Sequence, residues 1–100
     1  ENKLLKSDIE YKKGKKYGYE KHWNIDSDLV IERYYIKGRK TGIHKAWWNK
    51  GNLKFEYHFN EKGEYNGSVK EWDESGLLYK AFNYEKNLHP RYYCIVIIRG

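Results

Sequence analysis

The chain has 100 residues, which is enough for one domain. Aromatic residues make up 18% of it, with eleven tyrosines, four tryptophans and no methionine, and this balance favours strands over helices. The formal net charge is +6, but acidic and basic residues alternate locally, which is typical of a solvated surface and not of a nucleic-acid patch. The single cysteine excludes an intrachain disulfide framework and a cysteine zinc cluster. No stretch approaches the roughly 18 apolar residues of a membrane span.

The chain repeats itself with a period of 24 to 25 residues. Each copy opens with G-x-x-x-G, then places a tryptophan five residues after the second glycine, a leucine six residues later and an aromatic residue six beyond that. The glycine pairs are Gly14/Gly18, Gly38/Gly42 and Gly63/Gly67, and the tryptophans are Trp23, Trp47 and Trp72. A fixed period of this length predicts an array whose units bury their apolar faces by stacking on their neighbours.

In chain order we predict a single repeat domain over residues 1–100. It comprises a leading half unit at 1–13, full repeats at about 14–37, 38–62 and 63–86, and a terminal half unit at 87–100. Each full repeat is predicted to be a hairpin with a three-residue loop whose last residue is left-handed. These loops are Ile25-Asp26-Ser27, Asn49-Lys50-Gly51 and Glu74-Ser75-Gly76.

The alternation of apolar and polar residues over 53–59 predicts a half-buried strand in the central repeat. With a three-residue loop, the predicted pairs are Trp48 with Asn52, Trp47 with Leu53, Lys45 with Phe55 and Ile43 with Tyr57. This register collects the apolar residues on one face, where the repeated tryptophans, leucines and aromatics form columns. The third column is Tyr11, Tyr35, Phe59 and Tyr84. The predicted fold is therefore all-β, a single-layer twisted antiparallel meander of about eight strands.

The pattern resembles the MORN repeat variant found in bacterial proteins labelled YwqK-family antitoxins. The resemblance is carried by YIKGRKTGIHKAWWNKGNLKFEYHF at 35–59 and recurs at 11–23 and 59–84. It implies tandem hairpin repeats in a single-layer sheet that is used for binding, together with neutralisation of a toxin. Ala81 departs from the acidic slot that Glu32 and Glu56 fill, and the family pattern carries no catalytic residues.

The candidate binding residues are Trp48, Tyr34, Lys21, Lys45 and Lys70. Each of the three lysines precedes a repeated tryptophan by two residues, on the aromatic side. Their stems can lie over the rings with the ammonium groups in water, or the lysines can form a cationic row that takes an acidic partner or an anionic head group. Trp48 and Tyr34 are predicted to be exposed on the opposite face, where aromatic side chains anchor partners.

No recognisable catalytic arrangement occurs, and we expect a non-enzyme without cofactor or metal. His44 is predicted to face Glu56, with His58 two residues beyond, which is the one grouping that could hold a metal. The glycine pairs are expected to serve backbone geometry, because a phosphate-binding glycine loop needs a following helix. Cys94 is expected to be buried and inert.

Residues 92–98 are apolar on both faces, so we expect either that the chain continues beyond Gly100 or that another molecule packs there, and we predict a homo-oligomer formed through this strand. We expect a protein-binding or scaffold module with a protein partner, in the manner of an antitoxin or immunity protein. The alternative is peripheral binding to an anionic membrane lipid or phosphoinositide through the lysine and aromatic surface. Nucleic acid ranks last, because the tryptophans are better explained as core. The chain starts at Glu1, so a cytoplasmic location and export after removal of an N-terminal segment both stay open.

Overall fold

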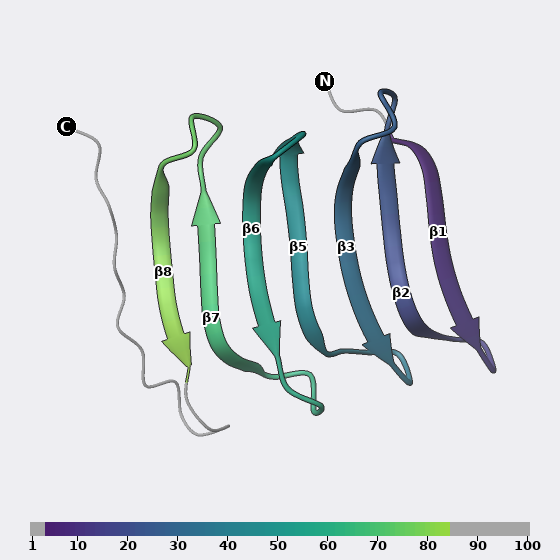
Figure 1. The fold of residues 1–100 in the computed structure, drawn as a ribbon. Coiled ribbons are helices and arrows are strands. Elements are labelled where there is room, and N and C mark those ends of the chain that lie inside the picture. Colours follow the sequence, from purple (N-terminus) through teal and green to yellow (C-terminus); the bar gives the residue numbers. More distant parts are fainter. Residues whose placement is uncertain (1–3, 85–100) are drawn as a thin grey trace.

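Residues 4–84 of the computed structural model are described here, and within them the chain forms one open antiparallel sheet without helices (Figure 1). The strands are β1 (Leu4–Lys12), β2 (Lys15–Asn24), β3 (Leu29–Ile36), β4 (Arg39–Lys40), β5 (Gly42–Asn49), β6 (Asn52–Phe59), β7 (Tyr65–Trp72) and β8 (Leu78–Tyr84). Their spatial order is β1-β2-β3-β5-β6-β7-β8, with the short β4 paired to β3. The predicted all-β meander of about eight strands is confirmed. The terminal half unit, including Cys94 and the predicted oligomer strand at 92–98, lies outside the described residues.

The loops within the hairpins follow the prediction in two repeats of three. Ser27 and Gly76 adopt left-handed backbones, with φ of 66° and 94°. The residue before each of these loops holds it with a side-chain oxygen: Asn24 Oδ1 accepts the amides of Asp26 and Asp28 at 2.9 and 3.0 Å. The central hairpin is tighter than predicted. Asn49 pairs with Asn52, so Lys50 and Gly51 alone form the turn, and the predicted pairing of Trp48 with Asn52 is wrong.

A β-bulge recurs at the same place in every hairpin. Each repeated tryptophan pairs with its leucine, as predicted, but the residue after the leucine is left out of the pairing. The three tryptophan pairs are Trp23 with Leu29, Trp47 with Leu53 and Trp72 with Leu78. The bulged residues are Val30, Lys54 and Tyr79. An extra residue reverses which face the rest of the strand presents, because side chains alternate between the two faces.

The bulge makes two predicted pairs of the central hairpin wrong. Lys45 pairs with Glu56 and not with Phe55, and Ile43 pairs with His58 and not with Tyr57. The repeated glutamates therefore share a face with the repeated lysines and tryptophans. We call this the indole face. The column of Tyr35, Phe59 and Tyr84 turns to the opposite face, which we call the ring face, so the prediction of one common apolar face is wrong.

The aromatic residues of the ring face touch one another in a row across the sheet. Tyr35 contacts the His44 ring at 5.6 Å between centroids, and His44 contacts Phe59 at 4.7 Å. Phe59 stacks on Tyr65 at 5.0 Å, and Tyr65 reaches Tyr84 at 5.2 Å. Such pairs stabilise by about 0.5–1.5 kcal/mol each beyond the area that they bury. The row thus ties together five successive strands of an otherwise single layer.

The second glycine of each G-x-x-x-G lies directly opposite the repeated aromatic residue. The pairs are Gly18 with Tyr35, Gly42 with Phe59 and Gly67 with Tyr84. At Gly18 the φ angle is 107°, and a Cβ atom would lie 2.5 Å from Glu10 Oε1. Residues with a side chain rarely adopt such a φ, and Gly42 and Gly67 also have positive φ angles, of 73° and 101°, so the second glycines serve backbone geometry.

Candidate binding surface

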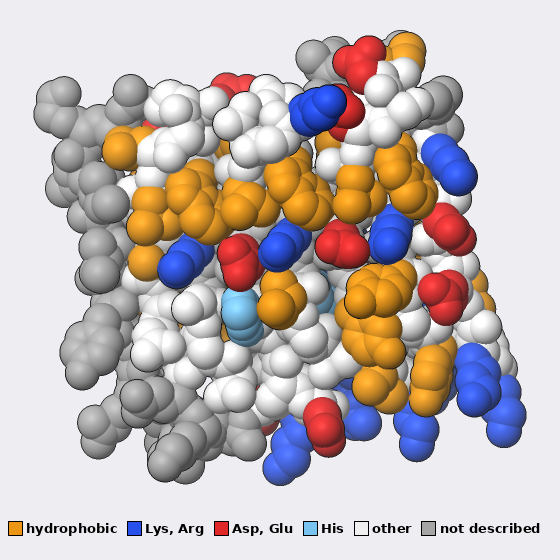
Figure 2. Space-filling model, viewed as in Figure 1, with side chains coloured by type: hydrophobic (Ala, Val, Ile, Leu, Met, Phe, Trp, Pro, Cys, Tyr) orange, Lys and Arg blue, Asp and Glu red, His pale blue; other side chains and the backbone are white. Residues whose placement is uncertain are grey.

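The indole face carries an apolar band and, beside it, a row of alternating charges. Figure 2 shows this face, with the hydrophobic band crossing the strands and basic and acidic side chains alternating directly below it. Strand pairing aligns the charged residues one by one from β1 to β8. The row, which we call the charge ladder, is Asp8, Lys21, Glu32, Lys45, Glu56 and Lys70, and it ends at Ala81.

Each lysine of the charge ladder faces at least one carboxylate side chain on a neighbouring strand. Lys21 Nζ lies 3.8 Å from Glu32 Oε2 and also 4.9 Å from the Tyr19 ring centroid. Lys45 has a glutamate on both sides, whereas Lys70 has Glu56 on one side and Ala81 on the other. The lysines thus alternate with acids and do not form the cationic row that was one of the two sequence interpretations.

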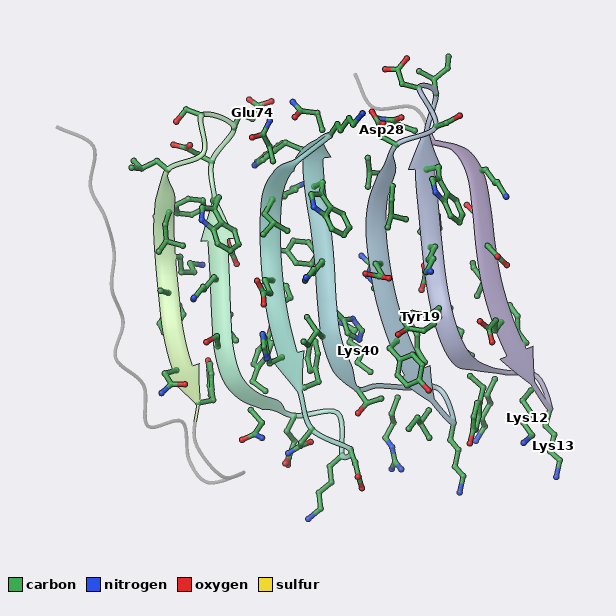
Figure 3. The ribbon with its side chains drawn as sticks, in the orientation of Figure 1. Lys12, Lys13, Tyr19, Asp28, Lys40 and Glu74 are labelled. Carbon is green, nitrogen blue, oxygen red and sulfur yellow. The ribbon has the colours of Figure 1, made fainter. Side chains whose placement is uncertain are left out.

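A shallow hollow of about 490 Å³ opens beside the charge ladder. Its walls come from β2, β3 and β5, and its lining residues are Tyr19, Glu32, Tyr34, Gly42, Ile43 and Lys45. The Tyr19 and Tyr34 rings meet edge to face at 4.8 Å between centroids. Tyr19 is 45% exposed and Ile43 is 46% exposed, so large apolar side chains at this hollow face solvent. Figure 3 labels Tyr19 on β2.

The predicted anchors Tyr34 and Trp48 differ from each other in the structure. Tyr34 lines the hollow together with Lys45, so it lies on the indole face, and its predicted placement on the opposite face is wrong. Trp48 is half-buried, and its indole Nε1 donates a hydrogen bond to the Trp72 carbonyl at 3.0 Å. Lys54 Nζ lies 4.7 Å from the Trp48 ring centroid. The Trp48 ring thereby connects β5 to β7 across the intervening strand, and the prediction that it is exposed is wrong.

His44 is a core residue and not a partner of Glu56. It pairs with Tyr57, is 2% exposed, and its Nε2–H donates to the Tyr34 carbonyl at 2.8 Å and to that of Thr41 at 3.1 Å. Burial lowers the pKa of His44, although its hydrogen bonds to backbone oppose this effect. His58 does contact Glu56, at 2.9 Å between Nε2 and Oε2. Among the described residues, metal-ligating side chains do not gather in threes at a spacing that would hold an ion.

The sequence analysis missed a buried carboxylate cluster on the side of the sheet opposite the ladder. Glu20 is 4% exposed and contacts His22 Nε2 at 2.6 Å, Lys16 Nζ at 2.9 Å and Arg33 Nη1 at 3.4 Å. Burial would raise the pKa of Glu20, but hydrogen bonds from His22 and Lys16 and the nearby positive charges lower it to about 2. Ser7 Oγ bonds the other ring nitrogen of His22 at 2.7 Å. The cluster joins β1, β2 and β3, and the three donors already share the Glu20 carboxylate, so we assign it to stability.

Tyr19 and Ile43 are the two exposed apolar residues of the hollow, and neither was among the binding residues predicted from the sequence. Both follow the second glycine of a G-x-x-x-G directly, and this slot is the signal that could have identified them. Searches against protein-family models, curated proteins and solved structures each return no match for this chain. Within residues 4–84 no helix has the length and apolar character needed to cross a membrane. The fold class is therefore established by the sheet itself, as an open antiparallel array of hairpins.

Proposed function

We propose that this chain is a non-catalytic protein-binding module built from MORN-like hairpin repeats, with the hollow on the indole face as its contact site. The observation that carries the proposal is the exposure of Tyr19 and Ile43 around that hollow. Protein interfaces concentrate binding energy in a few buried residues, often tyrosine or tryptophan, within an apolar centre that a polar rim surrounds. Glu32 and Lys45 supply such a rim here.

The shape of the sheet supports a protein as the partner. The principal extents are 41 × 34 × 15 Å, so the molecule presents a broad surface relative to its thickness. Repeat arrays use extended surfaces of this kind to contact partners over several units. Of the predicted binding residues, Tyr34 and Lys45 line the hollow and Lys21 pairs with its Glu32. Lys70 extends the ladder farther along the same face.

The resemblance to YwqK-family repeats suggests an antitoxin- or immunity-like role, in which the partner is a toxin that the module neutralises. The proposal that the repeats belong to the MORN type rests on the sequence motifs that carry this resemblance. The recurring tryptophan–leucine pairs and bulges support the proposal, because they show that the hairpins repeat regularly. Under this proposal the indole face covers a surface that the partner needs for its activity.

Binding to an anionic membrane through Lys21, Lys45 and Lys70 is the alternative. The structure supports membrane binding less well than protein binding, because each of these lysines pairs with an acidic residue on an adjacent strand. Placing these lysines against an anionic surface would bring Glu32 and Glu56 to the same surface, and their repulsion would offset the attraction.

Affinity capture with a matched pair of variants tests the proposal. Ile43→Arg places a charge in the hollow, whereas Ile25→Arg makes the same change at a 65% exposed residue in the β2–β3 loop. The product of the adjacent gene is the first bait partner to test, followed by proteins captured from the source cells and identified by mass spectrometry. We expect Ile43→Arg to weaken capture of a specific partner at least about tenfold and Ile25→Arg to leave it unchanged. Equal capture by both variants, or liposome binding without any protein partner, would contradict the proposal.

A further inference from the structure

A second surface gathers positive charge at one end of the sheet, and its hollow shares no lining residue with the hollow of the indole face. Two successive hairpin turns, β1–β2 and β3–β4, supply exposed basic residues there: Lys12, Lys13, Lys15, Lys37, Arg39 and Lys40. We call this the basic edge. The six positive charges of the basic edge equal the formal net charge of the whole chain, +6. The other fourteen basic residues of the chain are matched in number by its fourteen acidic residues.

Within the part of the chain that the structure describes, no residue of the basic edge pairs with an acidic residue across the strands, in contrast to the lysines of the charge ladder. The six residues of the basic edge form none of the ion pairs found within 4.0 Å there, in contrast to Lys16, Lys21, Arg33 and Lys80. At the opposite ends of the strands, the β2–β3 and β7–β8 turns carry acidic residues instead, namely Asp26, Asp28, Asp73 and Glu74. Figure 3 shows Asp28 and Glu74 at that end, and Lys12 and Lys13 at the β1–β2 turn. In the next turn at this end of the sheet, which joins β6 to β7, Glu61 and Glu64 flank Lys62. The positive region therefore stops after two turns.

The basic edge contains a hollow of about 320 Å³ that lysine side chains surround. Its lining residues are Lys12, Lys13, Lys15, Tyr17 and Lys37, with no carboxylate among them. Lys12 Nζ lies 5.0 Å from the Tyr17 ring centroid, which holds one ammonium group at the wall of the hollow. We call this site the lysine hollow.

The backbone fixes how the two turns approach each other. Lys13 and Lys37 both have left-handed backbones, with φ of 53° and 52°, and a glycine follows each of them. The Gly38 amide donates to the Lys16 carbonyl at 2.9 Å, which locks the second turn against β2. A Cβ atom at Gly38 would lie 3.8 Å from Lys15 Cβ, so the two turns are in contact. The lysines are therefore brought together by the fold and not only by their proximity in the sequence.

We propose that the lysine hollow binds a ligand that carries two or more closely spaced phosphate groups. Lysine ammonium groups bind phosphate as point charges, and four of them line this hollow without a carboxylate, so the site suits a compact anion of high charge. A single phosphate monoester carries about 1.5 to 2 negative charges at neutral pH, so four lysines match more than one phosphate. The site is distinct from the hollow of the indole face, and it does not depend on protein binding there.

A titration with inorganic tripolyphosphate, followed by calorimetry and by NMR of the lysine and Tyr17 signals, tests this site. Lys13→Asn/Lys37→Asn removes two charges while keeping residues that accept the left-handed backbone. Lys50→Asn/Lys62→Asn removes two charges elsewhere and is the matched control, since Lys62 occupies the equivalent turn slot beside Glu61 and Glu64. We expect saturable binding that the first variant weakens about tenfold and the control leaves within about twofold, with affinity that falls as salt is added.

Two further probes establish the nature of the ligand. Vesicles that carry a phosphoinositide head group, compared with vesicles of phosphatidylcholine alone, show whether the phosphates can belong to a lipid. Retention on the first vesicles that is lost in Lys13→Asn/Lys37→Asn supports a lipid source, and binding of tripolyphosphate alone supports a soluble one. An oligoglutamate peptide of equal charge that binds as tightly as tripolyphosphate would overturn the proposal in favour of an acidic protein segment. Equal loss of binding in the control variant, or no saturable binding of either phosphate probe, would also overturn it.

Discussion

Reversing the charge of Lys45 is expected to destabilise the sheet about twice as much as reversing that of Lys70. Lys45 lies between Glu32 and Glu56, whereas Lys70 lies between Glu56 and Ala81. An opposite-charge pair across two strands stabilises by roughly 0.2–1 kcal/mol, and a like-charge pair costs a similar amount. Turning one favourable pair into an unfavourable one costs about 1 kcal/mol if each pair contributes about 0.5 kcal/mol. Lys45→Glu does this to two pairs, at a cost of about 2 kcal/mol, and Lys70→Glu does it to one pair, at a cost of about 1 kcal/mol.

Urea denaturation followed by tryptophan fluorescence measures both values as changes in the free energy of unfolding. At about 1 M salt the Debye length falls to about 3 Å, so the cost of both variants should shrink. Ala81→Glu completes the charge ladder beside Lys70 and should add roughly 0.2–1 kcal/mol of stability. Equal costs for Lys45→Glu and Lys70→Glu, or costs that do not respond to salt, would refute the reasoning.

Three further predictions concern single residues. The pKa of Glu20 is lowered from 4.5 to about 2, so the contribution of its carboxylate to stability is complete above about pH 5 and is lost as the pH falls toward 2. Glu20→Gln should therefore be less stable than the wild type at neutral pH, and its free energy of unfolding should change less between pH 5 and pH 2. Because burial lowers the pKa of His44 from its usual 6.5, its NMR titration should have a midpoint below pH 6.5, and a midpoint at or above pH 6.5 would contradict the burial described. Trp48→Phe removes the hydrogen bond to the Trp72 carbonyl and should cost about 1 kcal/mol by thermal denaturation, and an unchanged stability would mean that the bond contributes nothing.

The period of the sequence was sufficient to predict the strands and most of the turns. The tryptophan–leucine spacing predicted the pairs Trp47–Leu53 and Trp72–Leu78, and the left-handed slots at Ser27 and Gly76 were also correct. The bulge was not predictable, because a valine, a lysine and a tyrosine occupy its three positions and share no property. One extra residue then reversed the faces of half of each hairpin, which is why the charge ladder was missed.

The candidate site was predicted in part for the same reason. Lys45 and Tyr34 were selected from sequence, and they line the hollow, but the assumed register placed them on different faces. Trp48 was interpreted as exposed because no sequence pattern reveals that its indole reaches a carbonyl two strands away. The basic edge was missed because the local alternation of charges hides two short runs, KKGKK and KGRK, that only the stacking of turns brings together.

NMR chemical-shift mapping on addition of a captured partner tests the central claim most directly, since it reports which face of the sheet the partner covers. The proposed function predicts the largest changes at Tyr19, Tyr34 and the Ile43 methyl groups, with little change at Tyr57 and Phe59 on the ring face. The largest changes at Tyr57 and Phe59, with Ile43 unaffected, would contradict it.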